Sequence, residues 1–228
     1  MMNDFFIIGA YWSSRPDSIE NVGDKIVQIL VQLSNIDEQF SNWYELGSSR
    51  KKALEKKVIL NVETIKKICL KKIKRGEIDD NGFSDIGYSV QLWTGHKEEE
   101  ACSISFYVGA TFKTENLSNS CVLKLPYEGD AFNRLLLLNK AKTILNFFVE
   151  IFKPDYAVLT SQILRNYLDV ANNIGWITYR KTVNSISQVS KEIIYEESDF
   201  AHWFYLKSEG KCYDYSLMKE FCTLKEIL

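Results

Sequence analysis

The chain has 228 residues, of which 46% are hydrophobic and 25% charged, and its formal net charge is -2. This size and composition are typical of a soluble globular protein with one substantial core, and they exclude a largely disordered chain. Neither a membrane-length apolar run nor the basic region and cleavage site of a signal peptide is present, so we expect a cytoplasmic protein.

The N-terminal part of the chain predicts one strand and two helices. Residues Phe5 to Tyr11 are apolar nearly throughout, which indicates a strand inside a sheet. A helix follows, with Ser14 or Asp17 as its expected N-cap and an apolar stripe at three- and four-residue spacing from Ile19 to Ile36. A second helix is predicted from Val62 to Lys74.

Residues 87–126 predict an antiparallel meander. Three short runs, GYSVQLWTG, ACSISFYVGA and NSCVLKLP, each alternate with a period of two and are separated by turn-like segments. One face of each run is apolar and the other is mixed, which is typical of strands buried on one side only. We expect this meander to lie at the centre of the sheet, with helices on its apolar face.

The remaining residues predict further elements of both kinds. They are a long apolar helix capped by Asp130 and ending at Phe152, a strand over 156–161, a short helix capped by Ser161, a strand from Gly175, a strand from His202, and a terminal helix from Tyr215 to Leu228. Residues 185–199 fit a strand or a loop. No proline- or glycine-rich seam divides the chain, so we expect a single α+β domain over residues 1–228, with a mixed, mainly antiparallel sheet.

The residue types that usually carry catalysis or hold metals do not cluster at ligand spacing in the sequence. The five cysteines are odd in number and lack C-x-x-C spacing, which favours a reducing compartment. Neither His96 nor His202 has a plausible partner nearby in sequence, and no phosphate-binding loop, dinucleotide fingerprint or nucleophile elbow is present. We therefore expect no enzymatic activity, no catalytic residue, no metal and no cofactor.

Two alternatives involve nucleic acid. Asp155, Glu209 and Lys211 formally match the two carboxylates and the lysine of a metal-dependent nuclease, at a loose spacing. Residues 50–75 hold eleven Lys or Arg against two Glu, a local charge of +9 that leaves -11 for the rest of the chain. This basic stretch would suit a phosphate backbone or would be an ordinary solvated helix face.

The five tryptophans, Trp12, Trp43, Trp93, Trp176 and Trp203, are spread along the chain. Most are expected in the core. One or two that remain exposed would mark a binding hot spot.

Several phrases together resemble the immunity protein 52 family. They are YWSSRPDSIE, NIDEQFSNWYELGSSRKKAL, GYSVQLWTG, N-x-x-VLKLP, PDYAVLTS with the following Arg165, and GWITYR, and they cover Tyr11 to about Arg180 in the expected order.

The resemblance implies a cytoplasmic, non-enzymatic protein of bacterial contact-dependent and type VI secretion systems. Such a protein binds a cognate toxin with a restriction-endonuclease-like fold and protects the producing cell. Because a nuclease usually has a basic cleft, acidic loops are the first candidates for contact with this partner. These residues are Glu98, Glu99, Glu100, Glu196, Glu197 and Asp199. We expect no membrane or nucleic acid as a partner.

Overall fold

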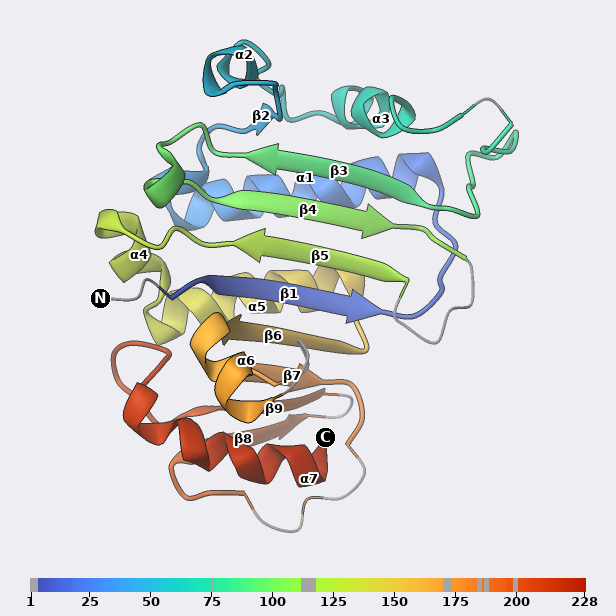
Figure 1. Cartoon of the computed structure of the whole chain (residues 1–228). Coiled ribbons are helices and arrows are strands. Elements are labelled where there is room, and N and C mark those ends of the chain that lie inside the picture. The colour runs from blue at the N-terminus through green and yellow to red at the C-terminus, as the bar shows by residue number, and fades with distance from the viewer. Residues whose placement is uncertain are drawn as a thin grey trace.

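The computed structural model describes residues 4–74, 76–111, 118–169, 174–183, 186, 189–198 and 201–228. Its strands form one open, antiparallel, nine-stranded sheet with the order β2-β3-β4-β5-β1-β6-β7-β9-β8 (Figure 1). The strands are β1 (Phe6–Trp12), β2 (Tyr44–Glu45), β3 (Tyr88–Trp93), β4 (Ser103–Val108), β5 (Asn119–Lys124), β6 (Tyr156–Ser161), β7 (Ile177–Arg180), β8 (Ile193–Ser198) and β9 (Ala201–Leu206). The mixed α+β fold expected from the sequence is confirmed.

The described helices comprise seven α-helices and three 3₁₀ helices. They are α1 (Ile19–Ile36), η1 (Glu38–Phe40), α2 (Arg50–Leu54), α3 (Val62–Leu70), η2 (Glu98–Glu100), α4 (Gly129–Leu135), α5 (Leu138–Phe152), α6 (Gln162–Leu168), η3 (Tyr215–Thr223) and α7 (Leu224–Ile227). None of the helices in the described ranges combines the length and apolarity needed to cross a bilayer.

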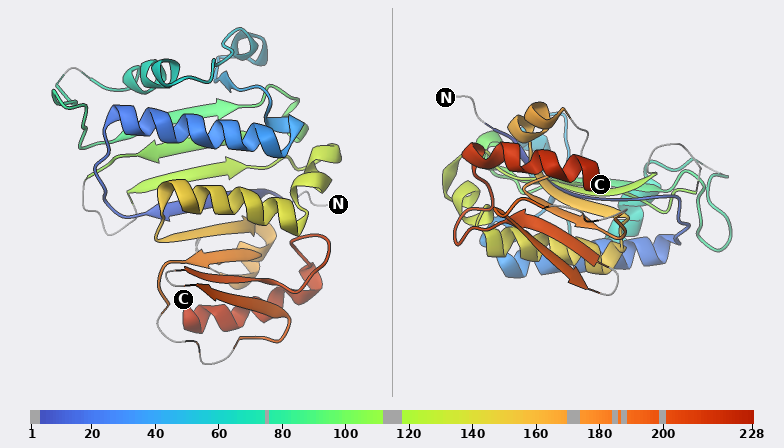
Figure 2. Two further views of the ribbon diagram at one scale, coloured as in Figure 1. Left: turned by 180° about the vertical axis from the view of Figure 1, so that it is seen from behind. Right: turned by 90° about the horizontal axis from the view of Figure 1, so that it is seen from below.

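Helices cover the two faces of the sheet unequally. On the rear face, as seen from behind in Figure 2, α1 and α5 lie across the strands from β3 to β6. On the front face, α6, η3 and α7 cover the half of the sheet that contains β6 to β9 (Figure 1). No described helix covers the front of β3, β4, β5 and β1.

The first strand is the fifth of nine in the sheet, which confirms its predicted internal position. Its residue Ile7 is paired with Lys124 of β5 on one side and with Thr160 of β6 on the other. The strand therefore joins the two halves of the sheet through pairings that are distant in sequence.

The predicted meander is confirmed as β3, β4 and β5, which occupy the second to fourth places in the sheet. All of its predicted apolar positions are buried: Tyr88, Val90, Leu92, Cys102, Ile104, Phe106, Val108, Cys121, Leu123 and Leu125. They face the rear layer, because alternate side chains of a strand point to opposite faces of the sheet. The mixed side chains of the same strands therefore point to the front.

Helix α1 is confirmed with the predicted apolar stripe, but its N-cap is Ser18 rather than Ser14 or Asp17. The Ser18 hydroxyl accepts a hydrogen bond from the Asn21 backbone N–H at 3.3 Å. The two expected caps have other partners: Ser14 donates to the carbonyl of Thr111, and Asp17 accepts from Lys25.

The second predicted helix ends earlier than expected, at Leu70 rather than Lys74. The backbone N–H groups of Lys71, Lys72 and Ile73 each donate to the carbonyl three residues earlier. A tightened last turn of this kind closes many helices.

The long helix predicted from Asp130 to Phe152 is wrong in one respect, because it is two helices, α4 and α5. Leu137 is extended and forms an antiparallel bridge with Lys211, so that Leu136 accepts from Cys212 and Leu138 donates to Gly210. The backbone groups at this point thus bond to a distant segment instead of continuing the helix. Asp130 lies in the first turn of α4, whose N-cap is Glu128.

The C-terminal elements are confirmed with changes. The ambiguous stretch contains strand β8, and the short helix α6 has the predicted cap, since Ser161 accepts from the backbone N–H of Leu164. The predicted terminal helix is mostly the 3₁₀ helix η3, and only its last turn, α7, is α-helical.

Candidate functional site

The structure separates the acidic residues that the sequence proposes for partner contact. Glu98, Glu99 and Glu100 form η2, the turn between β3 and β4, whereas Glu196 and Glu197 belong to the edge strand β8. Strands β4 and β8 are six places apart, which is roughly 29 Å at the usual strand spacing. Asp199 lies outside the described residues.

The two glutamates of β8 point to opposite faces of the sheet. Glu196 lies on the rear face, where its carboxylate pairs with Lys142 of α5 at 2.6 Å and also accepts from the hydroxyl of Tyr205. Glu197 lies on the front face and accepts a hydrogen bond from Tyr195, whose hydroxyl is also 2.9 Å from Nδ1 of His202. They do not form one acidic surface.

The glutamates of η2 form a compact acidic turn with a fixed backbone. The carbonyl of Glu99 accepts from the backbone N–H groups of Tyr127 and Glu128 at 3.0 and 3.1 Å, and the carbonyl of Glu100 accepts from the side chain of Gln39. Glu98 and Glu100 are exposed and Glu99 is half-buried. Within the described ranges, none of the three side chains has an ion-pair partner.

The carboxylates of the acidic turn affect the pKa of a neighbouring tyrosine, Tyr127. Burial raises the pKa of Tyr127 above its usual value, and the carboxylates of Glu99, Glu98 and Glu128 raise it further. The turn therefore presents unneutralised negative charge at the end of the meander.

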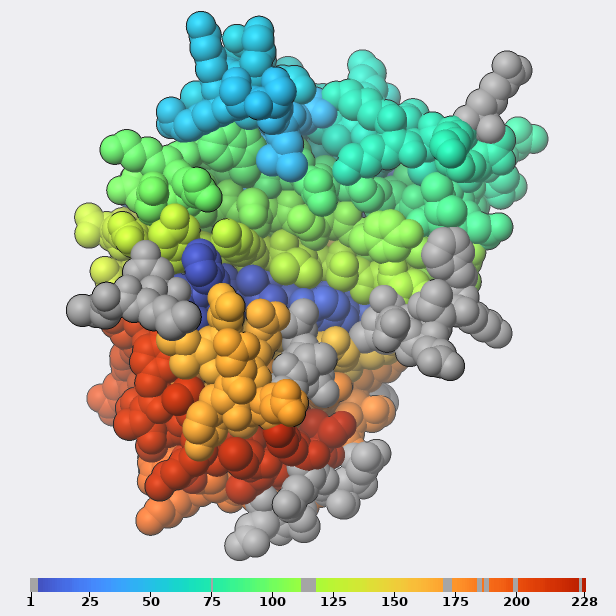
Figure 3. Space-filling model, viewed as in Figure 1, coloured from blue at the N-terminus to red at the C-terminus, as the bar shows by residue number. Residues whose placement is uncertain are grey.

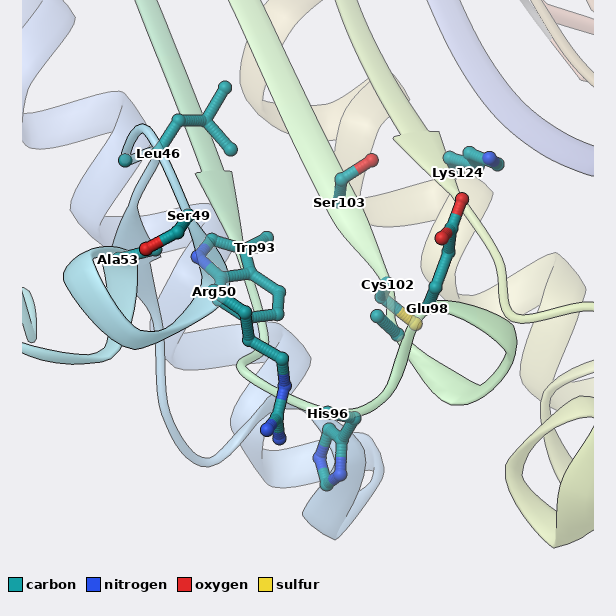
Figure 4. A pocket seen from close by; sticks show the side chains of 12 residues that line it. Leu46, Ser49, Arg50, Ala53, Trp93, His96, Glu98, Cys102, Ser103 and Lys124 are labelled. Atoms are coloured by element: carbon teal, nitrogen blue, oxygen red, sulfur yellow. The ribbon is translucent and has the colours of Figure 1, made fainter.

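A pocket of about 350 Å³ adjoins the acidic turn (Figure 4). Leu46, Gly47, Ser49, Arg50 and Ala53 line it from the segment that contains α2, and Trp93, His96, Glu98, Ala101, Cys102, Ser103 and Lys124 line it from the ends of β3, β4 and β5. Trp93, Ser103 and Lys124 occupy adjacent registered positions on the front face. The pocket therefore opens at a corner of that face.

Of the five tryptophans, Trp93 is the one that is not fully buried, and it therefore becomes the candidate hot spot. Trp12, Trp43, Trp176 and Trp203 are all buried, whereas Trp93 is half-buried and lines the pocket. Its strand alternation already assigns it to the face opposite Leu92. The contribution of Leu46 and Arg50 to the same pocket was missed, because only the folded chain places α2 beside β3.

The nuclease alternative lacks an assembled site. Asp155 follows the C-terminal end of α5, and Lys211 bridges Leu137 at the N-terminal end of the same helix. Fifteen helical residues separate these ends, which is about 22 Å. Asp155 instead accepts from the backbone N–H of Ser13 at 2.8 Å. The three residues cannot hold one metal ion in this arrangement.

The basic stretch is partly neutralised by carboxylates of the same chain. Lys66 pairs with Glu20 and Glu63, and Lys71 pairs with Glu45 at 2.6 Å. These contacts reduce the positive field available to a phosphate backbone.

Within the described residues, no group of three or more His, Cys, Asp or Glu side chains is placed to hold a metal ion. Four of the five thiols are buried, and burial raises the pKa of Cys69 and of Cys212 to about 12. Such thiols are poor nucleophiles at neutral pH, since the thiolate is the reactive form.

The model of a family described as Immunity protein 52 matches residues 4–187, which is most of the chain and includes the acidic turn, the pocket and strands β1 to β7. A search of curated proteins found no match.

Proposed function

The chain belongs to the immunity protein 52 family, and from this premise we propose that it neutralises a cognate nuclease toxin by binding it. The toxin is a DNase effector with a restriction-endonuclease-like fold, delivered by a type VI or contact-dependent secretion system. The protein acts in the cytoplasm of the producing cell, by stoichiometric binding and without catalysis.

The family match is the observation that carries this proposal. Immunity proteins of polymorphic toxin systems act by binding their toxins, so the match supports a binding surface rather than an active centre. The separation of Asp155 from Lys211 by the length of α5 removes the arrangement on which the nuclease alternative depended.

The acidic turn is the proposed rim of the contact. A nuclease that grips phosphates presents a basic surface, and Glu98 and Glu100 offer exposed carboxylates without an ion-pair partner among the described residues. Glu196 is a weaker candidate, because Lys142 already neutralises it.

Co-expression tests this proposal. We expect bacteria that express the cognate toxin to lose viability, and we expect this chain to restore growth and to co-purify with the toxin as a stable complex. An inactive toxin variant controls for expression burden, and a DNA cleavage assay with purified components checks that inhibition is direct. Failure of the folded protein to rescue growth or to inhibit cleavage would contradict the proposal.

A further inference from the structure

We propose that the toxin docks on the uncovered half of the sheet's front face and that the pocket beside Trp93 receives an anchoring side chain of the toxin. We call this half the open sheet face. The inference rests on the proposed function and names the contact surface for it.

Strand register identifies the side chains of the open sheet face. Gln91 of β3 is paired with Ser105 of β4, which is paired with Val122 of β5, which is paired with Gly9 of β1. Because paired residues point to the same face, the full set follows from this row and its neighbours. The set comprises Ser89, Gln91 and Trp93 of β3, Ser103, Ser105 and Tyr107 of β4, Ser120, Val122 and Lys124 of β5, and Ile7, Gly9 and Tyr11 of β1.

The open sheet face is visible as a broad band in the space-filling view. In Figure 3 the green strands and the blue β1 lie between the cyan region of α2 and α3 and the orange α6, without a helix in front of them. The rear face of the same four strands is buried beneath the helical layer of α1 and α5, so the open sheet face is where these strands can meet another molecule.

The open sheet face shares the scarcity of charged residues that is typical of interface centres. A quarter of the chain is charged, yet Lys124 is the single charged side chain among the twelve registered positions. Interface centres are depleted in charged residues, because charges are costly to remove from water. Tyrosine and serine, which are enriched in antibody paratopes, supply aromatic contact area and adaptable hydrogen bonds.

The aromatic side chains of the face are held in place before any partner binds. The ring of Tyr11 lies over Gly9, where an added Cβ would be 2.5 Å from its hydroxyl oxygen, and it stacks on Tyr156 at a centroid distance of 4.9 Å. The Tyr107 hydroxyl donates to the carbonyl of Ile86 at 2.6 Å. Side chains that are ordered in the free protein lose little conformational entropy on binding.

The open sheet face alone is smaller than a standard protein–protein interface. Four strands of about six residues present roughly 400 Å² of planar area at the usual strand spacing and rise. A standard interface buries about 800 Å² on each partner. The loops that line the pocket and the acidic turn at its edge supply the remainder.

Charge favours a protein with a basic rim as the occupant. Lys124 is the single charged residue among the registered positions of the face, and Glu98 and Glu100 border the face at the β3–β4 end. This arrangement suits a partner with a mainly polar, uncharged centre and cationic margins. A nuclease toxin provides the complementary pattern.

Matched charge insertions test this assignment. In Gln91→Arg and Ser105→Arg, a long cationic side chain is added at an exposed and at a central position of the open sheet face. In the control Gln32→Arg, the same group is added to the exposed side of α1 on the rear of the molecule. We expect both front variants to weaken toxin binding by at least 100-fold in a titration and to lose protection in co-expression, while the control changes affinity by less than about threefold.

The outcomes separate this inference from the proposed function. If wild-type protein binds and protects but the folded Gln91→Arg and Ser105→Arg variants do so equally well, the open sheet face is not the contact and the proposed function stands. If wild-type protein neither binds nor protects, the proposed function fails and this inference fails with it. If the front variants instead convert a dimer of the free protein into monomers in light scattering, the occupant is a second copy and the assignment to the toxin is overturned. Circular dichroism and thermal melts confirm that each variant is folded.

Discussion

The guanidinium of Arg134 in α4 donates to both carboxylate oxygens of Asp37, at 2.9 and 3.1 Å, just after the end of α1. Lys140 of α5 donates to the same carboxylate at 2.7 Å, and the Asp37 side chain is almost completely buried. One acidic residue therefore connects α1, α4 and α5. Removal of the Asp37 carboxylate leaves Lys140 without an ion-pair partner among the described residues and leaves Arg134 with only Glu38, at 3.4 Å, which is costly.

We expect Asp37→Asn to lower the free energy of unfolding by about 3 kcal/mol, the lower end for a broken buried pair, because Arg134 is partly exposed. Chemical denaturation measures this change. The control is Asp24→Asn, which removes an exposed carboxylate from α1 and should change stability by less than about 0.5 kcal/mol. Equal effects of the two substitutions would show that the Asp37 network does not stabilise the fold.

The same carboxylate predicts the acid sensitivity of the protein. Burial would raise the pKa of Asp37, but hydrogen bonds from Arg134 and Lys140 outweigh it, and the pKa lies well below its usual value. A carboxylate whose pKa is depressed in the folded protein stabilises the fold at pH values above its unfolded-state pKa of about 4. This stabilisation is lost as the pH falls from that value through the folded-state pKa. We expect the unfolding free energy of the wild type to decrease below pH 4, and the decrease to be shallower in Asp37→Asn.

Gly87, at the start of β3, is required for two separate reasons. Its φ is +71°, and an added Cβ would be 2.6 Å from the backbone nitrogen of Ala110. Gly76 shares the positive φ, at +89°, but a Cβ there has no described atom within 4 Å. We expect Gly76→Ala to cost about 1 kcal/mol from backbone strain alone, and Gly87→Ala to cost at least 2 kcal/mol more. Thermal unfolding compares the two, and similar melting temperatures would contradict the predicted clash.

The five thiols differ in access to reagents. Cys222 is exposed, whereas Cys69, Cys102, Cys121 and Cys212 are buried, with pKa values raised by burial. We expect one thiol to react rapidly with a disulfide reagent at pH 8 in the native protein and five to react after denaturation. The variant Cys222→Ser should abolish the rapid phase. If a thiol of that variant still reacted rapidly, at least one of the four buried cysteines would be accessible to the reagent in the native protein.

The acidic turn should affect the rate of toxin binding more than the lifetime of the complex. We expect the triple substitution of Glu98, Glu99 and Glu100 by Gln to reduce the association rate by about 3- to 10-fold at low ionic strength. The difference should shrink above about 0.5 M salt, where charges are screened within a few ångströms. Stopped-flow kinetics measure the association rate and its dependence on salt concentration. The double variant Glu196→Gln/Glu197→Gln serves as the control. If it reduced the association rate more than the triple variant does, the toxin would contact β8 rather than the acidic turn.

Much of the fold follows from local patterns. The stripe from Ile19 to Ile36 and the alternation in residues 87–126 specify which side of each element is buried, and those assignments are confirmed. The break at Leu137 could not be predicted, because a run of leucines continues a helix by every local criterion. The break depends on the bridge to Lys211, which is more than 70 residues away in sequence.

The candidate site was predictable only in part. Alternation shows that Ser105 and Gln91 share a face, but it does not show that α6 and η3 cover the other half of the sheet and leave these residues open. The sequence proposes both Glu98 and Glu196 for partner contact because both lie in acidic segments, although the sheet order places them far apart. Long-range strand order is therefore the information that the sequence patterns lack.

The central position of β1 has a consequence for how the protein is made. The ribosome adds roughly 5 to 20 residues each second, so β6 is synthesised roughly 8 to 30 s after β1. The other neighbour, β5, is also synthesised after β1, so this apolar strand lacks both neighbours for most of that interval. A sheet closed by such distant pairings folds slowly. The proposed protective role therefore calls for a reserve of protein that has folded before the toxin arrives.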